Sequence, residues 1–337
     1  MSVPATSPSG ATRTPVHVLT GFLGSGKTTL LCNLLADPEF SDTAVIINEF
    51  GEAGLDHLLV REVTEDVMLL SSGCLCCTVR DDLVTTLADL DRMQRAGEIS
   101  RFSRVVVETT GLADPAPILQ AILTDPLLTG SFGLGSVVTT IDAINGVHTL
   151  AAQSEARQQL RMADRVVLTK ADLASEAEKT AAADCWRSLN RHAPLSIASN
   201  GRVDACEVFA PNPPSWKRFE VLQEVAPNRT TLFKASSHHD ETINTFTVRL
   251  SRAVDWHAFE EWLQLLLASR GDSILRVKGL LAVTGDSRPV VVQGVQHVMY
   301  PPEKLPQWPD PAQPQGWLVF IARDLTQQAI ESSLQSL

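Results

Sequence analysis

The residues with the clearest chemical meaning form a glycine-rich segment near the N-terminus. Residues 21–28 read GFLGSGKT, which matches the phosphate-binding pattern G-x-x-x-x-G-K-[ST] at Gly21, Gly26, Lys27 and Thr28. Glycines permit a backbone in which successive N–H groups face a phosphate chain, and the helix expected after the loop adds its positive end. We expect Lys27 to reach the β- and γ-phosphates and the Thr28 hydroxyl to bind Mg²⁺. The alternative is a glycine-rich turn that binds nothing.

A second motif, ETTG, begins at Glu108, which is the last residue of the apolar run RVVVE at residues 104–108. Glu108 would then stand at a strand end facing the glycine-rich loop, where a carboxylate can hold Mg²⁺ through water. Gly111 could place its backbone N–H near the γ-phosphate. The alternative is a solvated glutamate at a strand end.

Residues 169–172 indicate which base the nucleotide carries. They read TKAD, which resembles the guanine-specifying pattern NKxD with Thr169 in place of Asn. Asp172 can accept hydrogen bonds from N1–H and the exocyclic amine of guanine, a donor pair that adenine lacks. The Lys170 stem can lie over the base plane. The alternative is that Asp172 caps a helix formed by the following LASEAEK.

Three of the six cysteines crowd into the segment GCLCC: Cys74, Cys76 and Cys77. Such crowding suits a soft metal ion such as Zn²⁺ better than a disulfide framework. A fourth ligand would come from Glu49 or Glu52, from water, or from a client protein. An incomplete site favours metal transfer over a structural role. The alternative is that these cysteines are buried or incidental.

The elements that position these motifs alternate along the chain. Apolar, β-rich runs occur at residues 15–20, 43–49, 104–110, 136–143, 165–172 and 194–199. Stretches with helical spacing lie between several of them, such as 27–37, 80–95 and 151–163. This alternation predicts an α/β fold, a doubly wound and mostly parallel sheet of the P-loop NTPase type with helices on both faces.

Composition suggests how the chain is divided. We expect a disordered tail at 1–14, the nucleotide-binding domain at 15–207, a Pro-, Ser- and Thr-rich linker at 208–240 and a C-terminal domain at 241–337. The C-terminal domain should be a smaller α+β unit. Its strand-like runs are 245–250, 273–283, 288–300 and 316–324, and its amphipathic helix is 255–271.

Charge and hydropathy exclude several functional classes. The 337 residues include 28 basic and 39 acidic side chains, a net charge of −11, which argues against a protein that coats nucleic acid. No apolar run is long enough to cross a membrane, and the N-terminal segment lacks the apolar core of a secretory signal. We therefore expect a cytoplasmic protein with reduced thiols. The oligomeric state stays open, with a homodimer among the options.

Together these motifs resemble the CobW family of P-loop GTPases, which includes metallochaperones and nitrile hydratase activators. The resemblance covers nearly the whole chain. Its matching segments are TGFLGSGKTTLL (20–31), INEFGEAGLD (47–56), GCLCC (73–77), ETTGLADP (108–115), TKAD (169–172), GDSILRVKGLL (271–281) and WLVFIARD (317–324).

The resemblance implies binding of GTP and GDP, slow GTP hydrolysis, Zn²⁺ or Co²⁺ at the cysteines and delivery to a client metalloprotein. The resemblance also implies the nucleotide-binding residues, which are Gly24, Ser25, Gly26, Lys27, Thr28, Thr29, Lys170 and Asp172. Many relatives have a long His-rich run near the linker, whereas this chain has only HHD at 238–240, which puts metal storage in doubt. Leu112 stands where Ras-like GTPases place a water-orienting Gln. Intrinsic hydrolysis should be slow unless Asp114 or a client supplies the missing group.

We therefore expect a GTPase in which Lys27, Glu108 and Asp114 serve catalysis. GTP and Mg²⁺ would order the NEFGE and GCLCC segments near the γ-phosphate, and hydrolysis would release them. One alternative is a non-catalytic, metal-responsive nucleotide-binding regulator with negligible turnover. Another is an ATP-dependent small-molecule kinase, against which the TKAD motif speaks.

Overall fold

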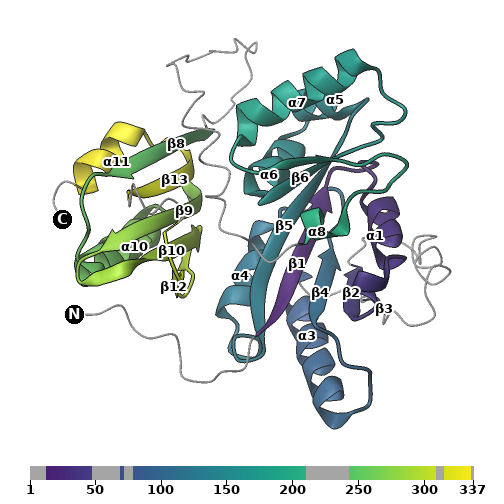
Figure 1. Cartoon of the computed structure of the whole chain (residues 1–337), viewed down its shortest axis with the longest axis horizontal. Coiled ribbons are helices and arrows are strands. Elements are labelled where there is room, and N and C mark those ends of the chain that lie inside the picture. Colours follow the sequence, from purple (N-terminus) through teal and green to yellow (C-terminus); the bar gives the residue numbers. More distant parts are fainter. Residues whose placement is uncertain (1–12, 48–68, 72–78, 210–242, 309–314, 335–337) are drawn as a thin grey trace. The chain divides into compact units, whose positions relative to one another are not determined.

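The computed structural model describes residues 13–47, 69–71, 79–209, 243–308 and 315–334. They form two compact units, of which the first ends at residue 209 and the second starts at residue 243. Figure 1 colours the first unit from purple to green and the second from green to yellow. Across these ranges, no helix combines the length and the hydropathy that a membrane span requires.

A seven-stranded sheet forms the centre of the first unit, in the order β3-β2-β4-β1-β5-β6-β7. All of its described strand pairs are parallel, which confirms the predicted fold class. Its strands are β1 (Thr14–Gly21), β2 (Thr43–Ile47), β3 (Leu69–Ser71), β4 (Arg104–Glu108), β5 (Phe132–Asp142), β6 (Arg165–Thr169) and β7 (Leu195–Ile197).

The strands β2 and β6 are short, mostly apolar runs without polar alternation. Every residue of β2 and of β6 is buried. Their valines and isoleucines favour extended backbone, and continuous apolar character is typical of a parallel strand that is covered on both faces. The sequence pattern therefore predicts the covering layers as well as the strands.

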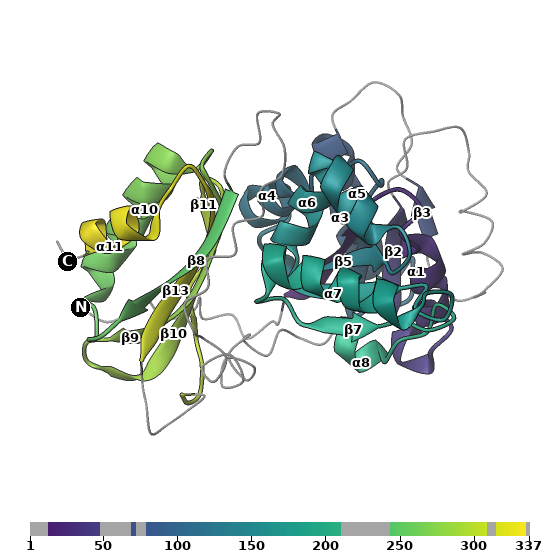
Figure 2. The ribbon, with the colours of Figure 1, turned by 90° about the horizontal axis from the view of Figure 1, so that it is seen from above.

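Helices cover both faces of the sheet (Figure 2). The leucines of α1 pack on one face together with Phe40, Val208 and Phe209, and α5, α6 and α7 pack on the other. The helices of this unit are α1 (Lys27–Leu35), the 3₁₀ helix η1 (Pro38–Phe40), α3 (Val79–Ala96), α4 (Ala116–Thr124), α5 (Gly146–Ala152), α6 (Ser154–Met162), α7 (Glu176–Asn190) and α8 (Ala205–Val208).

Strand register brings the ends of four strands to one edge of the sheet. In β1, Leu19 pairs with Glu108 at the end of β4, and Gly21 pairs with Thr140 near the end of β5. Asp142 of β5 in turn pairs with Thr169 at the end of β6. The loop that follows Gly21 therefore begins beside the last residues of β4, β5 and β6.

The second unit is an antiparallel sheet with helices on one face. Its order is β11-β10-β9-β13-β8, with β12 paired to β10. The helices α10 (Trp256–Arg270) and α11 (Gln327–Leu334) pack on the sheet through a core that includes Phe259, Leu263 and Phe320. Its strands are β8 (Ile243–Leu250), β9 (Ile274–Val283), β10 (Asp286–Val295), β11 (Val298–Met299), β12 (Glu303–Lys304) and β13 (Gly316–Arg323).

Two expected segments are subdivided in the structure. The stretch 151–163 contains the end of α5 and all of α6, because Gln153 has an extended backbone, φ −113° and ψ 121°, between them. The run 288–300 is a hairpin, β10 and β11, in which Val295 pairs with Val298. Gln296 forms the turn between them with φ 50°, a left-handed conformation. Glutamine seldom adopts this conformation, so the sequence does not indicate the turn.

Two expected boundaries shift by one or two residues. Thr14, which we assigned to the N-terminal tail, begins β1 and donates its backbone N–H to Ser131. Val208 and Phe209, which we assigned to the linker, are buried in the core beside α1. The rest of the expected linker, from residue 210 on, lies outside the described residues.

A buried histidine lies in the central strand of the first sheet. His17 of β1 is 3% exposed, and its Nδ1 accepts the backbone N–H of Ser136 at 2.9 Å. Burial lowers the pKa of His17 to about 4, and the nearby charges of Arg104 and Arg165 act in the same direction. The imidazole is therefore neutral in the folded protein at physiological pH.

We expect His17 to make the first unit less stable in acid. The unfolded chain takes up this proton near pH 6.5 and the folded protein only near about pH 4, so the free energy of unfolding falls as the pH drops between these values. His17→Asn keeps an acceptor for Ser136 but cannot titrate. Urea unfolding at pH 7 and at pH 5 should show a smaller loss of stability in this variant.

The effect of His17 must be taken from the difference between wild type and variant, because a second histidine titrates in the same range. Burial, with help from the Arg191 charge, also lowers the pKa of His192 to about 4, so part of the acid loss remains in the variant. Equal losses in wild type and His17→Asn would show that protonation of His17 is not coupled to unfolding.

Candidate functional site

The glycine-rich loop is folded as a phosphate-binding loop, which we call the P-loop (residues 21–28). It contains Gly21, Gly24, Ser25, Gly26, Lys27 and Thr28, and Thr29 follows in the first turn of α1. Gly26 precedes α1 with φ 87°, a left-handed conformation that favours glycine. Lys27 Nζ donates to the carbonyl oxygens of Gly21 at 2.9 Å and Phe22 at 3.3 Å. The predicted residues therefore share one loop that ends at a helix N-terminus.

Hydroxyl groups from two neighbouring strands hold the P-loop in place. Ser25 Oγ and Thr140 Oγ1 of β5 are hydrogen-bonded at 2.6 Å. Thr169 Oγ1 of β6 donates to the Ser25 carbonyl oxygen at 2.6 Å. Thr169, which replaces the Asn of the guanine pattern, thus links the P-loop to the TKAD segment through its hydroxyl.

Thr28 and Glu108 meet at the start of α1 and the end of β4. The Thr28 hydroxyl donates to Glu108 Oε1 at 2.6 Å, and Glu108 is 4% exposed. A hydroxyl and a carboxylate are hard oxygen donors of the kind that Mg²⁺ prefers. The two residues that the sequence assigns to Mg²⁺ are therefore in direct contact.

The segment after β4 packs directly against the P-loop. A Cβ atom added to Gly111 would lie 2.5 Å from the backbone nitrogen of Leu23, so only glycine fits there. Leu112, next to it, is 54% exposed. The Asp114 carboxylate accepts the backbone N–H of Ala116 at the start of α4. The catalytic role of Asp114 stays a prediction.

The TKAD segment turns sharply away from β6. Lys170 has φ 56°. Asp172 is exposed, and its Oδ1 accepts the backbone N–H of Asn200 at 2.8 Å. The helix-cap alternative for Asp172 is wrong, because Ser175 caps α7 in a capping box with Glu178.

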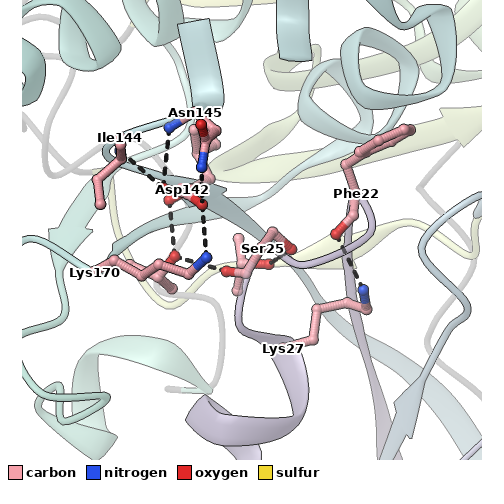
Figure 3. A network of polar contacts seen from close by, with 10 residues as sticks. Phe22, Ser25, Lys27, Asp142, Ile144, Asn145 and Lys170 are labelled. Atoms are coloured by element: carbon pink, nitrogen blue, oxygen red, sulfur yellow. Dashed lines mark hydrogen bonds and ion pairs between the residues drawn. The ribbon is translucent and has the colours of Figure 1, made fainter. Parts of the chain in front are cut away.

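Asp142 is a residue of this site that sequence reasoning missed. Its carboxylate lies between Asn145 and Lys170 (Figure 3). It accepts the Lys170 ammonium at 2.7 Å and the backbone N–H groups of Ile144 and Asn145. Burial opposes its ionisation, but these hydrogen bonds outweigh burial and hold the pKa of Asp142 below its usual range. The charge of Lys170 is thereby fixed at the end of β5.

Two family models match the chain. One, described as the CobW/HypB/UreG nucleotide-binding domain, matches residues 15–196. The other, the C-terminal domain of cobalamin synthesis protein CobW, matches residues 243–337. The chain belongs to the CobW family. This confirms the resemblance found in the motifs and places the chain among the P-loop GTPases.

Several CobW-family relatives align with nearly the whole length of this chain. It is 32% identical over 322 residues to zinc chaperone YjiA of Escherichia coli K12, covering 96% of this chain and 98% of that protein. It is 30% identical over 350 residues to zinc chaperone CobW of Pseudomonas aeruginosa, covering 96% and 91%. The crystal structure of Zn(II)-bound YjiA GTPase from E. coli has 27% identity and a TM-score of 0.69, covering 97% and 99%.

The metal ligands expected of a CobW-family protein lie outside the described residues. These are Cys74, Cys76, Cys77, Glu49 and Glu52. Within the described part of the chain, no three His, Cys, Asp or Glu side chains are grouped so that they could hold a metal ion. The predicted cysteine site therefore stays a prediction.

A pocket of about 380 Å³ lies beside the P-loop. Residues 22–25 line one wall, and the end of β5, α5 and α6 supply the others. Asp142 and Lys170 lie on its wall, as does Gln159 of α6, a second residue that the motifs did not reveal. Gln159 has no local signal because its partners are far away in the sequence.

We expect Lys27→Ala to remove tight nucleotide binding. The ammonium group lies inside the P-loop, and its loss removes a charge-assisted contact to the phosphates, which corresponds to an affinity loss of about 100-fold. Isothermal titration with GDP and GTP measures this loss. Lys179→Ala is the control, because Lys179 forms an ion pair with Glu176 on α7. Unchanged GDP affinity in Lys27→Ala would contradict the assignment.

We expect Asp142→Asn to weaken GDP and GTP binding by the same factor. The amide keeps the shape of Asp142 but loses the charge that holds Lys170, an interaction worth about 1 kcal/mol or a factor of about 5. The effect is equal for both nucleotides because we expect Lys170 to contact the base, which GDP and GTP share. Asp184→Asn on α7, which removes an exposed ion pair with Arg187, is the control. A loss confined to GTP would refute this role.

Proposed function

We propose that this CobW-family protein is a zinc metallochaperone controlled by GTP. It binds GTP with Mg²⁺ at the P-loop, holds Zn²⁺ at Cys74, Cys76 and Cys77, and passes the ion to a client metalloprotein when hydrolysis changes the nucleotide state. Support comes from the fold and P-loop geometry, from the two relatives named zinc chaperones and from the Zn(II)-bound structure of YjiA.

The observation that carries the proposal is the strand register beside the P-loop. Ile47 of β2 pairs with Glu108 on one side and with Ser71 of β3 on the other. Neighbouring strands lie about 4.8 Å apart, so Ser71 is about 10 Å from Glu108. In the sequence, the NEFGE segment follows β2 directly, and the GCLCC segment follows β3 after one residue. This favours coupling of the metal ligands to the γ-phosphate.

The residues present fit a magnesium ion. Thr28 and Glu108 offer a hydroxyl and a buried carboxylate within one hydrogen bond of each other. The ion, when bound, supplies positive charge that neutralises the phosphate oxygens. The chain itself contributes Lys27 for the β- and γ-phosphates and the backbone N–H groups of the P-loop, which orient the phosphate chain for attack by water.

The base-binding segment supports guanine as the base. Asp172 is exposed and held in place by the Asn200 backbone. Its carboxylate can accept the two donors of the guanine edge, and adenine would leave it without them. ATP-dependent phosphoryl transfer to a small molecule is correspondingly disfavoured.

Slow hydrolysis fits the segment that follows β4. The Leu112 side chain offers no hydrogen-bonding group to a water molecule, and Asp114 Oδ1 accepts the backbone N–H of Ala116. A client protein that supplies a water-orienting group would then couple hydrolysis to metal delivery. This gives the switch a default state that persists until the client binds.

We expect Zn²⁺ and GTP to change each other's affinity by the same factor. Reciprocity is required when both ligands bias one conformational equilibrium, and such factors typically lie between about 5 and 150. Isothermal titration of GTP with and without Zn²⁺, and of Zn²⁺ with and without a non-hydrolysable GTP analogue, measures both. Equal GTP affinities in the two conditions would refute nucleotide control.

Three variants test which residues carry the coupling between Zn²⁺ and GTP binding. Cys76→Ser should remove the coupling and leave GTP binding to the metal-free protein intact. Cys185→Ser is the matched control, because burial raises the pKa of the Cys185 thiol and makes it a poor metal ligand. Lys27→Ala should still bind Zn²⁺ although it no longer binds nucleotide tightly. Coupling that survives in Cys76→Ser would place the metal elsewhere.

A further inference from the structure

One glutamine connects α6 to the segment that follows β4. Gln159 is fully buried, and its Nε2 donates to the carbonyl oxygens of Gly111 at 3.1 Å and Ala113 at 3.0 Å. Thr139 Oγ1 of β5 donates to the backbone carbonyl of Gln159 at 2.9 Å. The backbone of Gln159 is therefore held by β5, and its side-chain amide binds the loop.

The loop that Gln159 binds also packs against the P-loop. We call residues 109–113 the ETTG loop, after the motif that it continues. Gly111 lies against the Leu23 backbone so closely that no side chain fits. Thr109 donates its backbone N–H to Leu19 and its hydroxyl to Thr20. Contacts with β1, the P-loop and Gln159 thus fix the ETTG loop.

We propose that Gln159 is a positioning residue for recognition of the γ-phosphate. By binding the carbonyl oxygens of Gly111 and Ala113, it keeps Gly111 packed against the P-loop. In this position the Gly111 N–H can donate to a third phosphate that extends beyond Lys27. A diphosphate does not reach that place. Gln159 therefore strengthens binding of GTP relative to GDP. The inference rests on the proposed binding of guanine nucleotides at the P-loop.

Gln159 does not replace the water-orienting Gln that the ETTG loop lacks. Both carbonyl contacts occupy its amide nitrogen, and the residue is fully buried. Its Oε1 has no hydrogen-bond partner among the described residues. The amide group is therefore placed to hold the backbone of the ETTG loop. This arrangement leaves its buried oxygen without a hydrogen bond, which costs free energy.

The test compares two buried amides of similar surroundings. Asn190 of α7 donates to the carbonyl oxygens of Leu160 and Ala163 at the end of α6, just as Gln159 binds the ETTG loop. Gln159→Met and Asn190→Leu each remove the donor and keep the approximate shape. Both lose stability, but only Gln159→Met releases the ETTG loop.

Isothermal titration with GDP and with the β,γ-imido analogue of GTP, both with Mg²⁺, gives the result. Loss of the bridging donor from two carbonyls should lower the analogue affinity of Gln159→Met by about tenfold and leave GDP affinity within about twofold. Asn190→Leu should keep the wild-type ratio of the two affinities. A wild-type ratio in Gln159→Met would overturn the inference.

A second variant keeps the proposal testable if Gln159→Met does not fold. Gln159→Glu has the same shape, and its carboxyl regains one donor only when protonated, so the analogue-to-GDP affinity ratio should rise as pH falls. A ratio that equals that of wild type at every pH would also overturn the inference. Failure of the wild-type protein to bind guanine nucleotides would instead refute the proposed function.

Discussion

The parallel pairing of β1 with β4 and β5 is the constraint on which the site depends. It brings the ends of β4, β5 and β6 to the same edge as the P-loop. Each contributes a hydroxyl or carboxylate: Glu108, Thr140 and Thr169. Because these contacts are buried or partly buried, loss of one partner leaves an unsatisfied polar group, which is costly. The conformation of the P-loop is therefore maintained by its neighbours as much as by its own glycines.

Two separate sets of contacts hold the two ends of the nucleotide site. Asp142 and Lys170 belong to the side where the base is expected, whereas Gln159 and Gly111 belong to the side of the terminal phosphate. The two sets share β5, through Asp142 in one and Thr139 in the other. In the functions that we propose for these two sets, affinity for the nucleotide and discrimination of its phosphorylation state depend on different residues, and both sets contact β5.

Local patterns predicted much of this molecule. The P-loop, the apolar parallel strands and the helices α1 and α3 have strong sequence signals, because periodicity and glycine spacing are local properties. Lys27 and Thr28 begin α1 after the P-loop, and Thr169 ends β6, as the patterns indicated. Their roles in nucleotide binding, and that of Asp172, stay predictions. The fold class follows from the alternation of strands and helices, but the strand order β3-β2-β4-β1-β5-β6-β7 does not.

The residues that sequence reasoning missed act over long range. Asp142 lies 28 residues from Lys170, and Gln159 lies 48 residues from Gly111. A single polar residue at a strand end or on a helix is also what a solvated surface would show, so type and spacing carry no signal. The break at Gln153 and the turn at Gln296 were missed for a related reason, since neither contains glycine or proline.

The left-handed backbone at Lys170 has a geometric consequence. A regular strand sends successive side chains alternately to two opposite faces. Lys170 departs from this pattern with φ 56°. The side chains of Thr169, Lys170 and Asp172 contact three different partners, which are the Ser25 carbonyl oxygen, the Asp142 carboxylate and the Asn200 backbone N–H. Residues 169–172 thereby connect the P-loop, the end of β5 and the segment around Asn200.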